Sequence, residues 1–150
     1  MEIRQDDPAA DHVSALLAHH LAELRSVMSS HAFALDSTGL SAPNVTFWTA
    51  WKGDELAGFV ALKALGDRAG ELKSMRAAQA LRGTGVGRAL LAHVIAEARV
   101  RRMARLYLET GTTALHAPAV ALYRSAGFES RGAFADYAVS PHNQFLVLRL

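Results

Sequence analysis

The sequence contains no cysteine. Disulfide bonds, cysteine-ligated zinc and a covalent acyl-enzyme on a thiolate are therefore excluded. No stretch approaches the roughly 18 apolar residues that a membrane-spanning helix needs, and residues 1–7 carry no hydrophobic segment of the kind found in signal peptides. We expect a cytoplasmic protein that does not contact a membrane.

A large excess of charge of one sign is also missing, because 16 lysines and arginines face 14 aspartates and glutamates, for a net charge of +2. This balance argues against a nucleic-acid-binding protein. The 7 histidines show no ligand spacing such as H-E-x-x-H, so no metal site is expected. The nearest basic cluster is explained by the solvated end of a helix, with contact to a phosphate or to DNA as the alternative. It consists of Arg99, Arg101, Arg102 and Arg105.

The hydrophobic pattern predicts helices and strands within one domain, residues 1–150, whose composition of 51% hydrophobic residues suits one core. Asp7-Pro8 is a plausible cap and first turn of the first helix, and the polar segment 29–44 predicts a short helix and a loop. The apolar stripe of the first helix comprises Val13, Leu16, Leu17, Leu21, Leu24 and Met28.

Six strands are predicted, and two of them should be parallel. They cover residues 45–51, 56–65, 71–77, 106–110, 128–137 and 144–150, with a hairpin turn at 52–55. Between the third and the fourth strand lies a helix of roughly twenty residues, which requires a right-handed crossover and a parallel pair. The last helix ends at Gly127. The apolar stripes of these two helices comprise Leu90, Leu91, Val94, Ile95 and Ala98 and, in the last helix, Ala119, Leu122, Tyr123 and Ala126.

A glycine-rich segment, Arg82-Gly83-Thr84-Gly85-Val86-Gly87, leads directly into the helix of the crossover. Three glycines at alternate positions let backbone N–H groups converge on an anion at a helix N-terminus, where the helix dipole also favours negative charge. The segment lacks the Gly-Lys-Ser/Thr of a P-loop, and its glycine spacing differs from the Rossmann G-x-G-x-x-G. It predicts a site for a pyrophosphate.

Two motifs resemble those of the GNAT superfamily of N-acetyltransferases. The first is R-x-x-G-x-G, filled by Arg82, Gly85 and Gly87, and the second is A-x-x-L-Y-x-x-x-G-F within residues 118–128. The resemblance covers essentially the whole chain. The chain resembles in particular a subgroup of small, mostly uncharacterised bacterial N-acetyltransferases. The segments that match this subgroup are Phe47-Trp48, Gly53-Asp54-Glu55-Leu56-Ala57-Gly58, Lys73-Ser74-Met75-Arg76, Leu108-Glu109-Thr110-Gly111 and Phe134-Ala135-Asp136-Tyr137.

This resemblance implies an α/β (α+β) GNAT fold, in which helices flank a mixed, mostly antiparallel sheet. The central parallel strands, 71–77 and 106–110, would splay apart and admit the pantetheine arm of acetyl-CoA. Lys73, Ser74 and Arg76 fit this picture, since polar side chains in a central strand are costly unless they face a cleft. The cofactor-binding residues implied are Met75, Arg76, Ala77, Arg82, Gly83, Thr84, Gly85, Val86, Gly87, Arg88, His116 and Tyr123.

The resemblance also names candidates for catalysis. Tyr123 matches the family's tyrosine that protonates the departing thiolate, and the alternative is one more aromatic residue on an apolar helical stripe. Glu71 and Glu109 are candidates for the general base, directly or through a water. A structural ion pair, for instance with Arg76, is the alternative for each carboxylate. His116 stands where the family often has an asparagine that ties the cofactor to the neighbouring strand, so that contact is in doubt.

Three aromatic residues of the first predicted strand favour a role in the core, with a cage around a ligand as the alternative. Trp48, Trp51 and Phe47 are expected in the core. The aspartate of the 134–137 segment lies between two aromatic residues, where it could hold a cationic amine, and turn chemistry explains it equally well.

The sequence therefore indicates an acetyl-CoA-dependent N-acetyltransferase that moves the acetyl group directly to an amine, without a metal. The acceptor is a small-molecule amine or a protein amine, selected by the first helix, the 29–44 segment and the final hairpin loop. A non-catalytic, regulatory acyl-CoA-binding module is the main alternative, and a binder of another nucleotide phosphate is a weaker one. A homodimer through a sheet edge is an expectation from the resemblance alone.

Overall fold

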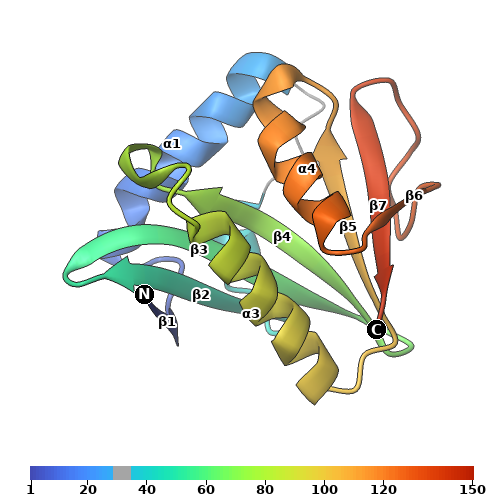
Figure 1. Cartoon of the computed structure of the whole chain (residues 1–150), viewed down its shortest axis with the longest axis horizontal. Helices are drawn as coiled ribbons and strands as arrows, with labels where there is room; N and C mark the ends of the chain where they lie inside the picture. Colours follow the sequence, from blue (N-terminus) through green and yellow to red (C-terminus); the bar gives the residue numbers. More distant parts are fainter. Residues whose placement is uncertain (29–34) are drawn as a thin grey trace.

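A seven-stranded mixed sheet organises the residues that the computed structural model describes, which are 1–28 and 35–150 (Figure 1). The strand order is β1-β2-β3-β4-β5-β7-β6, and every neighbouring pair is antiparallel except β4 and β5. The predicted mixed sheet with one parallel pair is therefore confirmed. The strands are β1 (Glu2–Gln5), β2 (Val45–Lys52), β3 (Glu55–Gly66), β4 (Ala69–Ala77), β5 (Arg105–Gly111), β6 (Glu129–Arg131) and β7 (Asn143–Arg149).

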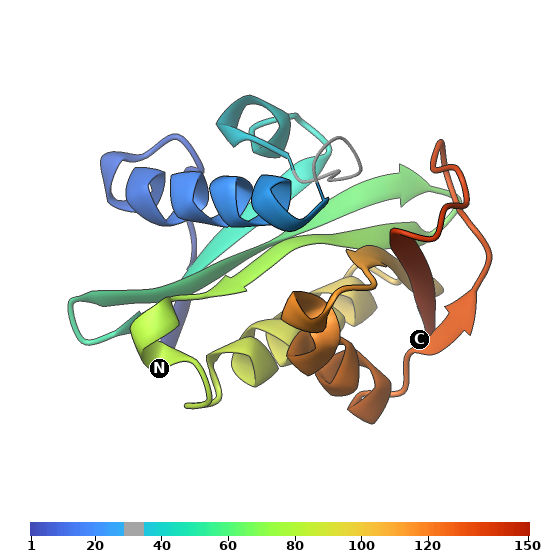
Figure 2. The ribbon, with the colours of Figure 1, turned by 90° about the horizontal axis from the view of Figure 1, so that it is seen from above.

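Helices cover both faces of the sheet (Figure 2). On one face lie α1 (Asp11–Met28) and the short α2 (Ser37–Leu40), and on the other lie α3 (Val86–Val100) and α4 (Ala117–Ser125). Short 3-10 turns, Gln79–Leu81 and Ala114–His116, precede α3 and α4. None of the helices in the described part of the chain is long and apolar enough to cross a membrane. Part of the predicted 29–44 segment, residues 29–34, lies outside the described residues.

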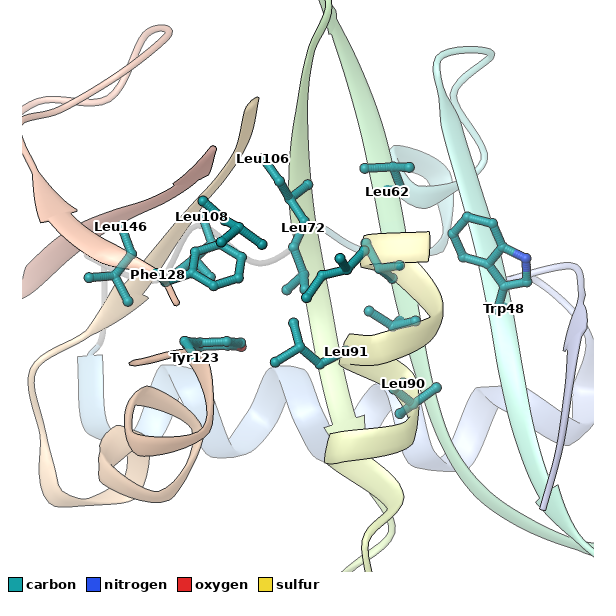
Figure 3. Close-up of a cluster of buried hydrophobic side chains, with 14 of the residues drawn as sticks. Trp48, Leu62, Leu72, Leu90, Leu91, Leu106, Leu108, Tyr123, Phe128 and Leu146 are labelled. Carbon is teal, nitrogen blue, oxygen red and sulfur yellow. The ribbon is translucent and has the colours of Figure 1, made fainter. Parts of the chain in front are cut away.

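The larger core lies between the sheet and the pair α3 and α4 (Figure 3). The predicted α3 stripe is buried there against Leu62, Leu72 and Leu106 of the sheet, together with Trp48. Gly127, with φ of +104°, follows α4 in the left-handed conformation, as predicted for a residue that ends a helix. This packing holds the N-terminus of α3 against the end of β4.

A second core separates the other face from α1 and α2. It contains Val13 and Leu17 of α1 with Phe47 and Phe59 of the sheet, so Phe47 is a core residue as predicted. Trp51, by contrast, is only partly buried and lies at the sheet margin beneath Arg4, whose guanidinium carbon is 4.3 Å from the ring centroid.

Three expectations from the sequence differ from the fold. The strand β1 was not predicted, because its four residues pair only along β2 and are mostly exposed. The helix α1 begins at Asp11 instead of near Pro8, since the Asp7 carboxylate caps a turn by accepting a hydrogen bond from Ala9 N at 2.8 Å. The strand predicted at 128–137 is limited to Glu129–Arg131, because the following residues form a loop that places Phe134 against Tyr107 and Phe145.

The parallel pair separates soon after it forms. Only three residue pairs connect β4 and β5, namely Ala69 with Arg105, Gly70 with Leu106 and Glu71 with Tyr107. Beyond this point, β4 contains a bulge where its register against β3 shifts, and Ser74 in the bulge has a positive φ of +55°. Figure 1 shows the two strands diverging from their common end, which is the predicted splay.

Candidate active site

A cavity of about 1030 Å³ occupies the gap where β4 and β5 diverge. Its wall is formed by β4, by the loop before α3, by the end of β5, by α4, and by His20 and Leu24 of α1. Of the predicted site residues, those in the wall are Met75, Arg76, Ala77, Arg82, Gly83, Gly85, Val86, Gly87, Arg88, Glu109, His116 and Tyr123. Two predicted residues, Thr84 and Glu71, are not in the wall.

The glycine-rich loop and the N-terminus of α3 line part of this cavity. Gly83 and Gly85 have φ of +79° and +90°, and a Cβ atom added at either would meet nothing within 4 Å. Gly85 is the N-cap of α3, so the free N–H groups of the first helical turn open toward this space. The Thr84 side chain instead faces the hairpin, donating to Leu81 O at 2.6 Å and accepting from Lys52 Nζ at 2.9 Å.

The strand β4 provides the side wall of the cavity. Beyond Glu71 its edge toward β5 is not paired with that strand, and the buried Ser74 hydroxyl has no hydrogen-bond partner among the residues that the structure describes. Together with the helix N-terminus, these groups suit a long ligand that carries a pyrophosphate at one end and amides along its arm. The residues present therefore fit acetyl-CoA.

Arg76 forms its ion pair with α1, and not with Glu71 as the alternative interpretation had suggested. Its two terminal nitrogens donate to Glu23 at 2.9 and 3.0 Å, and Arg82 Nη2 reaches the same carboxylate at 3.2 Å. The hydrogen bonds from Arg76 lower the pKa of Glu23 to about 2, against a smaller opposing effect of burial. The sequence of α1 does not reveal this role of Glu23, because Arg76 and Arg82 lie more than fifty positions away; within α1, Glu23 lies 3.2 Å from His19 Nε2.

The two candidate bases have different surroundings. Glu71 is 2% exposed and accepts a hydrogen bond from Tyr137 Oη at 2.7 Å, with Lys73 Nζ at 3.4 Å. Glu109 lies in the cavity wall, and burial raises its pKa even though a hydrogen bond from Asn143 Nδ2 opposes this effect. Of the two carboxylates, only Glu109 is accessible from the cavity.

Tyr123 and His116 also line the cavity. Burial, and secondarily the charge of Glu109, raises the pKa of Tyr123, so its hydroxyl keeps its proton. Figure 3 shows its ring beside Phe128 and directed from α4 toward Leu91 of α3. Burial lowers the pKa of His116, which favours a neutral ring, and its Nδ1 is 2.9 Å from Thr113 Oγ1. A Cβ added at Gly111 would lie 2.4 Å from this ring, so His116 packs directly on the end of β5.

Several residues that shape the site had not been identified from the sequence as parts of it. Besides Glu23, these are Asn143, which donates a hydrogen bond to Glu109, and His20, which lines the cavity. In the segment 134–137, the two aromatic side chains pack with Phe145, whereas the side chain of Asp136 is exposed and lies outside the cavity. Within residues 1–28 and 35–150, no three His, Asp or Glu side chains are arranged to hold a metal ion.

The sequence of this chain is similar to those of known acetyltransferases. The model of the Acetyltransferase (GNAT) family matches residues 13–128. The uncharacterised N-acetyltransferases YsnE of Bacillus subtilis and YedL of Escherichia coli are 42% and 43% identical to it, over 100% and 99% of this chain and 100% and 94% of theirs. IAA acetyltransferase of Azospirillum brasilense is 34% identical over 96% of this chain and 94% of its own.

Solved structures share the fold. A candidate acyl-CoA N-acyltransferase from Klebsiella pneumoniae superposes with a TM-score of 0.83 at 28% identity, over 99% of this chain and 97% of that one. A Bacillus subtilis acetyltransferase in complex with CoA gives a TM-score of 0.71 at 20% identity, over 99% and 98% of the two chains. At that identity the second likeness concerns the fold alone.

Proposed function

Since the chain belongs to the GNAT family of acetyltransferases, we propose that it transfers the acetyl group of acetyl-CoA to a primary amine of a small molecule. One observation carries the proposal. A continuous cavity joins the N-terminus of α3, the gap between β4 and β5, and the side chains of Tyr123 and Glu109. In this proposal the same space contains an anion site at the start of α3, a channel for the arm between β4 and β5, an acid, Tyr123, and a base, Glu109.

In this proposal the glycine-rich loop and β4 bind different parts of acetyl-CoA. The N–H groups at the start of α3, with Arg88 beside them, would hold the pyrophosphate, while Met75, Arg76 and Ala77 of β4 would contact the pantetheine arm. Acetyl-CoA, when bound, supplies an acetyl thioester that an uncharged amine can attack. His116, at the position where the family often has an asparagine, packs on the end of β5 and lines the cavity.

Glu109 is the better candidate for the general base. A base must come within hydrogen-bond reach of the proton that it removes, directly or through one water. Glu109 meets this requirement because it lines the cavity, whereas the Glu71 carboxylate is covered by Tyr137 and Lys73. Its raised pKa also brings Glu109 closer to neutral pH, where a carboxylate is a more effective base.

Tyr123 is the candidate acid. Its hydroxyl keeps its proton at neutral pH because burial raises its pKa, and no described residue accepts a hydrogen bond from it. Because Oη donates to no described residue, its proton is available to a leaving anion in the cavity. Glu109 and Tyr123 both line the cavity, and they lie close enough for the charge of Glu109 to help raise the pKa of Tyr123.

We place the acceptor at the end of the cavity that is lined by His20 and Leu24 of α1 and by Leu115 before α4, and we expect a small molecule there. His20 is 6% exposed, and burial lowers its pKa to about 4, so this end presents an uncharged ring at neutral pH. The similarity to a protein named IAA acetyltransferase supports a test set that includes the substrate in that name.

The test compares acetyl-CoA binding by calorimetry in the wild type, Gly85→Glu and Gly53→Glu. Both glycines have a positive φ and open space around the added side chain, so the two variants carry a similar backbone strain. Only Gly85→Glu puts a carboxylate at the N-terminus of α3, and we expect it alone to lose binding.

Thiol release is then followed in the wild type with a panel of small amines and with lysine peptides. Release that depends on a small amine supports the proposal. Binding without release for any amine would favour the non-catalytic module, and binding of ATP or NAD in preference to acetyl-CoA would refute the cofactor assignment.

A further inference from the structure

A short chain of hydrogen bonds leads from the last loop to the candidate base. Ser140 Oγ donates to Asn143 Oδ1 at 2.6 Å, and Asn143 Nδ2 donates to Glu109 Oε2. The first bond decides the orientation of the amide, because a flipped amide would place its NH2 group against the hydroxyl and its oxygen against the carboxylate. Ser140 thus directs the donor of Asn143 toward Glu109.

The backbone around Asn143 is held by other contacts. Asn143 lies opposite Gly111 in the antiparallel pair of β5 and β7, and Gln144 Nε2 donates to Gly111 O at 2.8 Å. Thr112 Oγ1 donates to Pro141 O at 2.9 Å. These contacts hold the turn at the end of β5 without touching Glu109, so the hydrogen bond from the Asn143 side chain to Glu109 has a separate task.

That task follows from the charges around Glu109. Glu109 faces two charged residues of β4: Lys73 lowers the pKa of Glu109, and Glu71 raises the pKa of Glu109. From α4 and from the loop before β7 it faces the hydroxyl groups of Tyr123 and Tyr137. Lys73 is shared, since its Nζ lies 2.7 Å from Tyr137 Oη and 3.4 Å from Glu71.

A buried carboxylate keeps its charge only when donors compensate for the lost water. Asn143 is itself 7% exposed, so its amide has little water to bond to in place of Glu109. We propose that Asn143 is a positioning residue, which holds Glu109 ionised and directed into the cavity, with Ser140 setting its orientation. This inference rests on the proposed function, in which Glu109 is the base.

The test uses three variants. Asn143→Leu removes the donor at similar size, and Ser140→Ala leaves the donor but frees the amide to rotate. Thr112→Val is the matched control, because it removes a hydrogen bond of the same turn without contacting Glu109. Folding is checked by circular dichroism, and Ser140→Ala keeps the test valid if the leucine variant does not fold.

Two quantities are measured. The pKa of Glu109 is followed in the free protein by NMR of 13C-labelled glutamate carboxyl groups, with Glu109→Gln to assign the signal. The acid limb of kcat/KM for the amine is measured in parallel. We expect Asn143→Leu to raise the pKa of Glu109 by about one unit and to move the acid limb of kcat/KM to higher pH by the same amount. The reason is that a hydrogen bond to a charged group contributes about as much free energy as one pKa unit, or more. Ser140→Ala should move both less, and Thr112→Val should move neither.

The NMR measurement separates failure of this inference from failure of the proposed function. An unchanged pKa of Glu109 in folded Asn143→Leu and Ser140→Ala would overturn the role of Asn143, whatever the activity. A pKa that rises while the acid limb stays in place would also overturn it, because Asn143 would then act on a carboxylate that is not the base. Absence of amine-dependent thiol release in the wild type would instead refute the proposed function.

Discussion

The ion pair between Glu23 and Arg76 joins α1 to the sheet at the cavity, and we expect Glu23→Gln to weaken the fold measurably. The pKa of Glu23 is lowered from 4.5 to about 2. A lowering of roughly 2.5 pKa units corresponds to at most about 3.4 kcal/mol at 1.36 kcal/mol per unit. The Glu23 side chain is 21% exposed, so solvent screening reduces the expected cost to about 2 kcal/mol.

The pH dependence of this loss has a defined sign. A carboxylate whose pKa is lowered by folding stabilises the protein above its unfolded pKa, and this stabilisation disappears as the pH falls through the folded value. The difference between the wild type and Glu23→Gln should therefore be complete at pH 7 and should shrink between about pH 4.5 and pH 2. In a chain of 150 residues, a loss of about 2 kcal/mol lowers Tm by roughly 4–8 °C.

Urea unfolding at pH 7, 4 and 3, together with thermal unfolding, measures this effect. Glu97→Gln is the matched control, because Glu97 pairs with Arg101 at 3.0 Å within α3 and both side chains are about one-third exposed. We expect the control to cost only about 0.3–0.5 kcal/mol. If Glu23→Gln costs no more than the control, or if its cost is the same at pH 3 as at pH 7, the reasoning is wrong.

Two further predictions concern the hydroxyl of Tyr123 and the close approach of β3 to β4. Tyr123→Phe should lower kcat by about 100-fold or more, because it removes the proposed acid. The free energy of unfolding should change by less than about 0.5 kcal/mol, because no described residue accepts a hydrogen bond from that hydroxyl. Thiol-release kinetics and thermal unfolding measure the two effects, and an unchanged kcat would exclude Tyr123 as the acid. Gly58→Ala should cost about 1–3 kcal/mol or more, since its Cβ would lie 2.3 Å from Arg76 O, whereas Gly132→Ala meets nothing within 4 Å. Equal urea midpoints for the two alanine variants would contradict that contact.

Local patterns in the sequence were enough to predict most of the elements. The apolar stripe of α3 and the alternation along β2 and β3 depend on neighbours along the chain, and the packing of both follows those patterns. The strand β1 and the point where β6 ends could not be predicted in the same way. Both strands are short, and their conformations depend on partner strands elsewhere in the sequence.

The sequence by itself determined the family, the glycine-rich loop and the parallel pair, because motif spacing and the handedness of a strand-helix-strand crossover are local properties. Only the tertiary structure decided which charges meet. It paired Arg76 with Glu23, enclosed Glu71 with Tyr137 and Lys73, and left Glu109 in the cavity beside Asn143. Charges act through space, and their energies depend on burial and distance, which no local pattern in a sequence records.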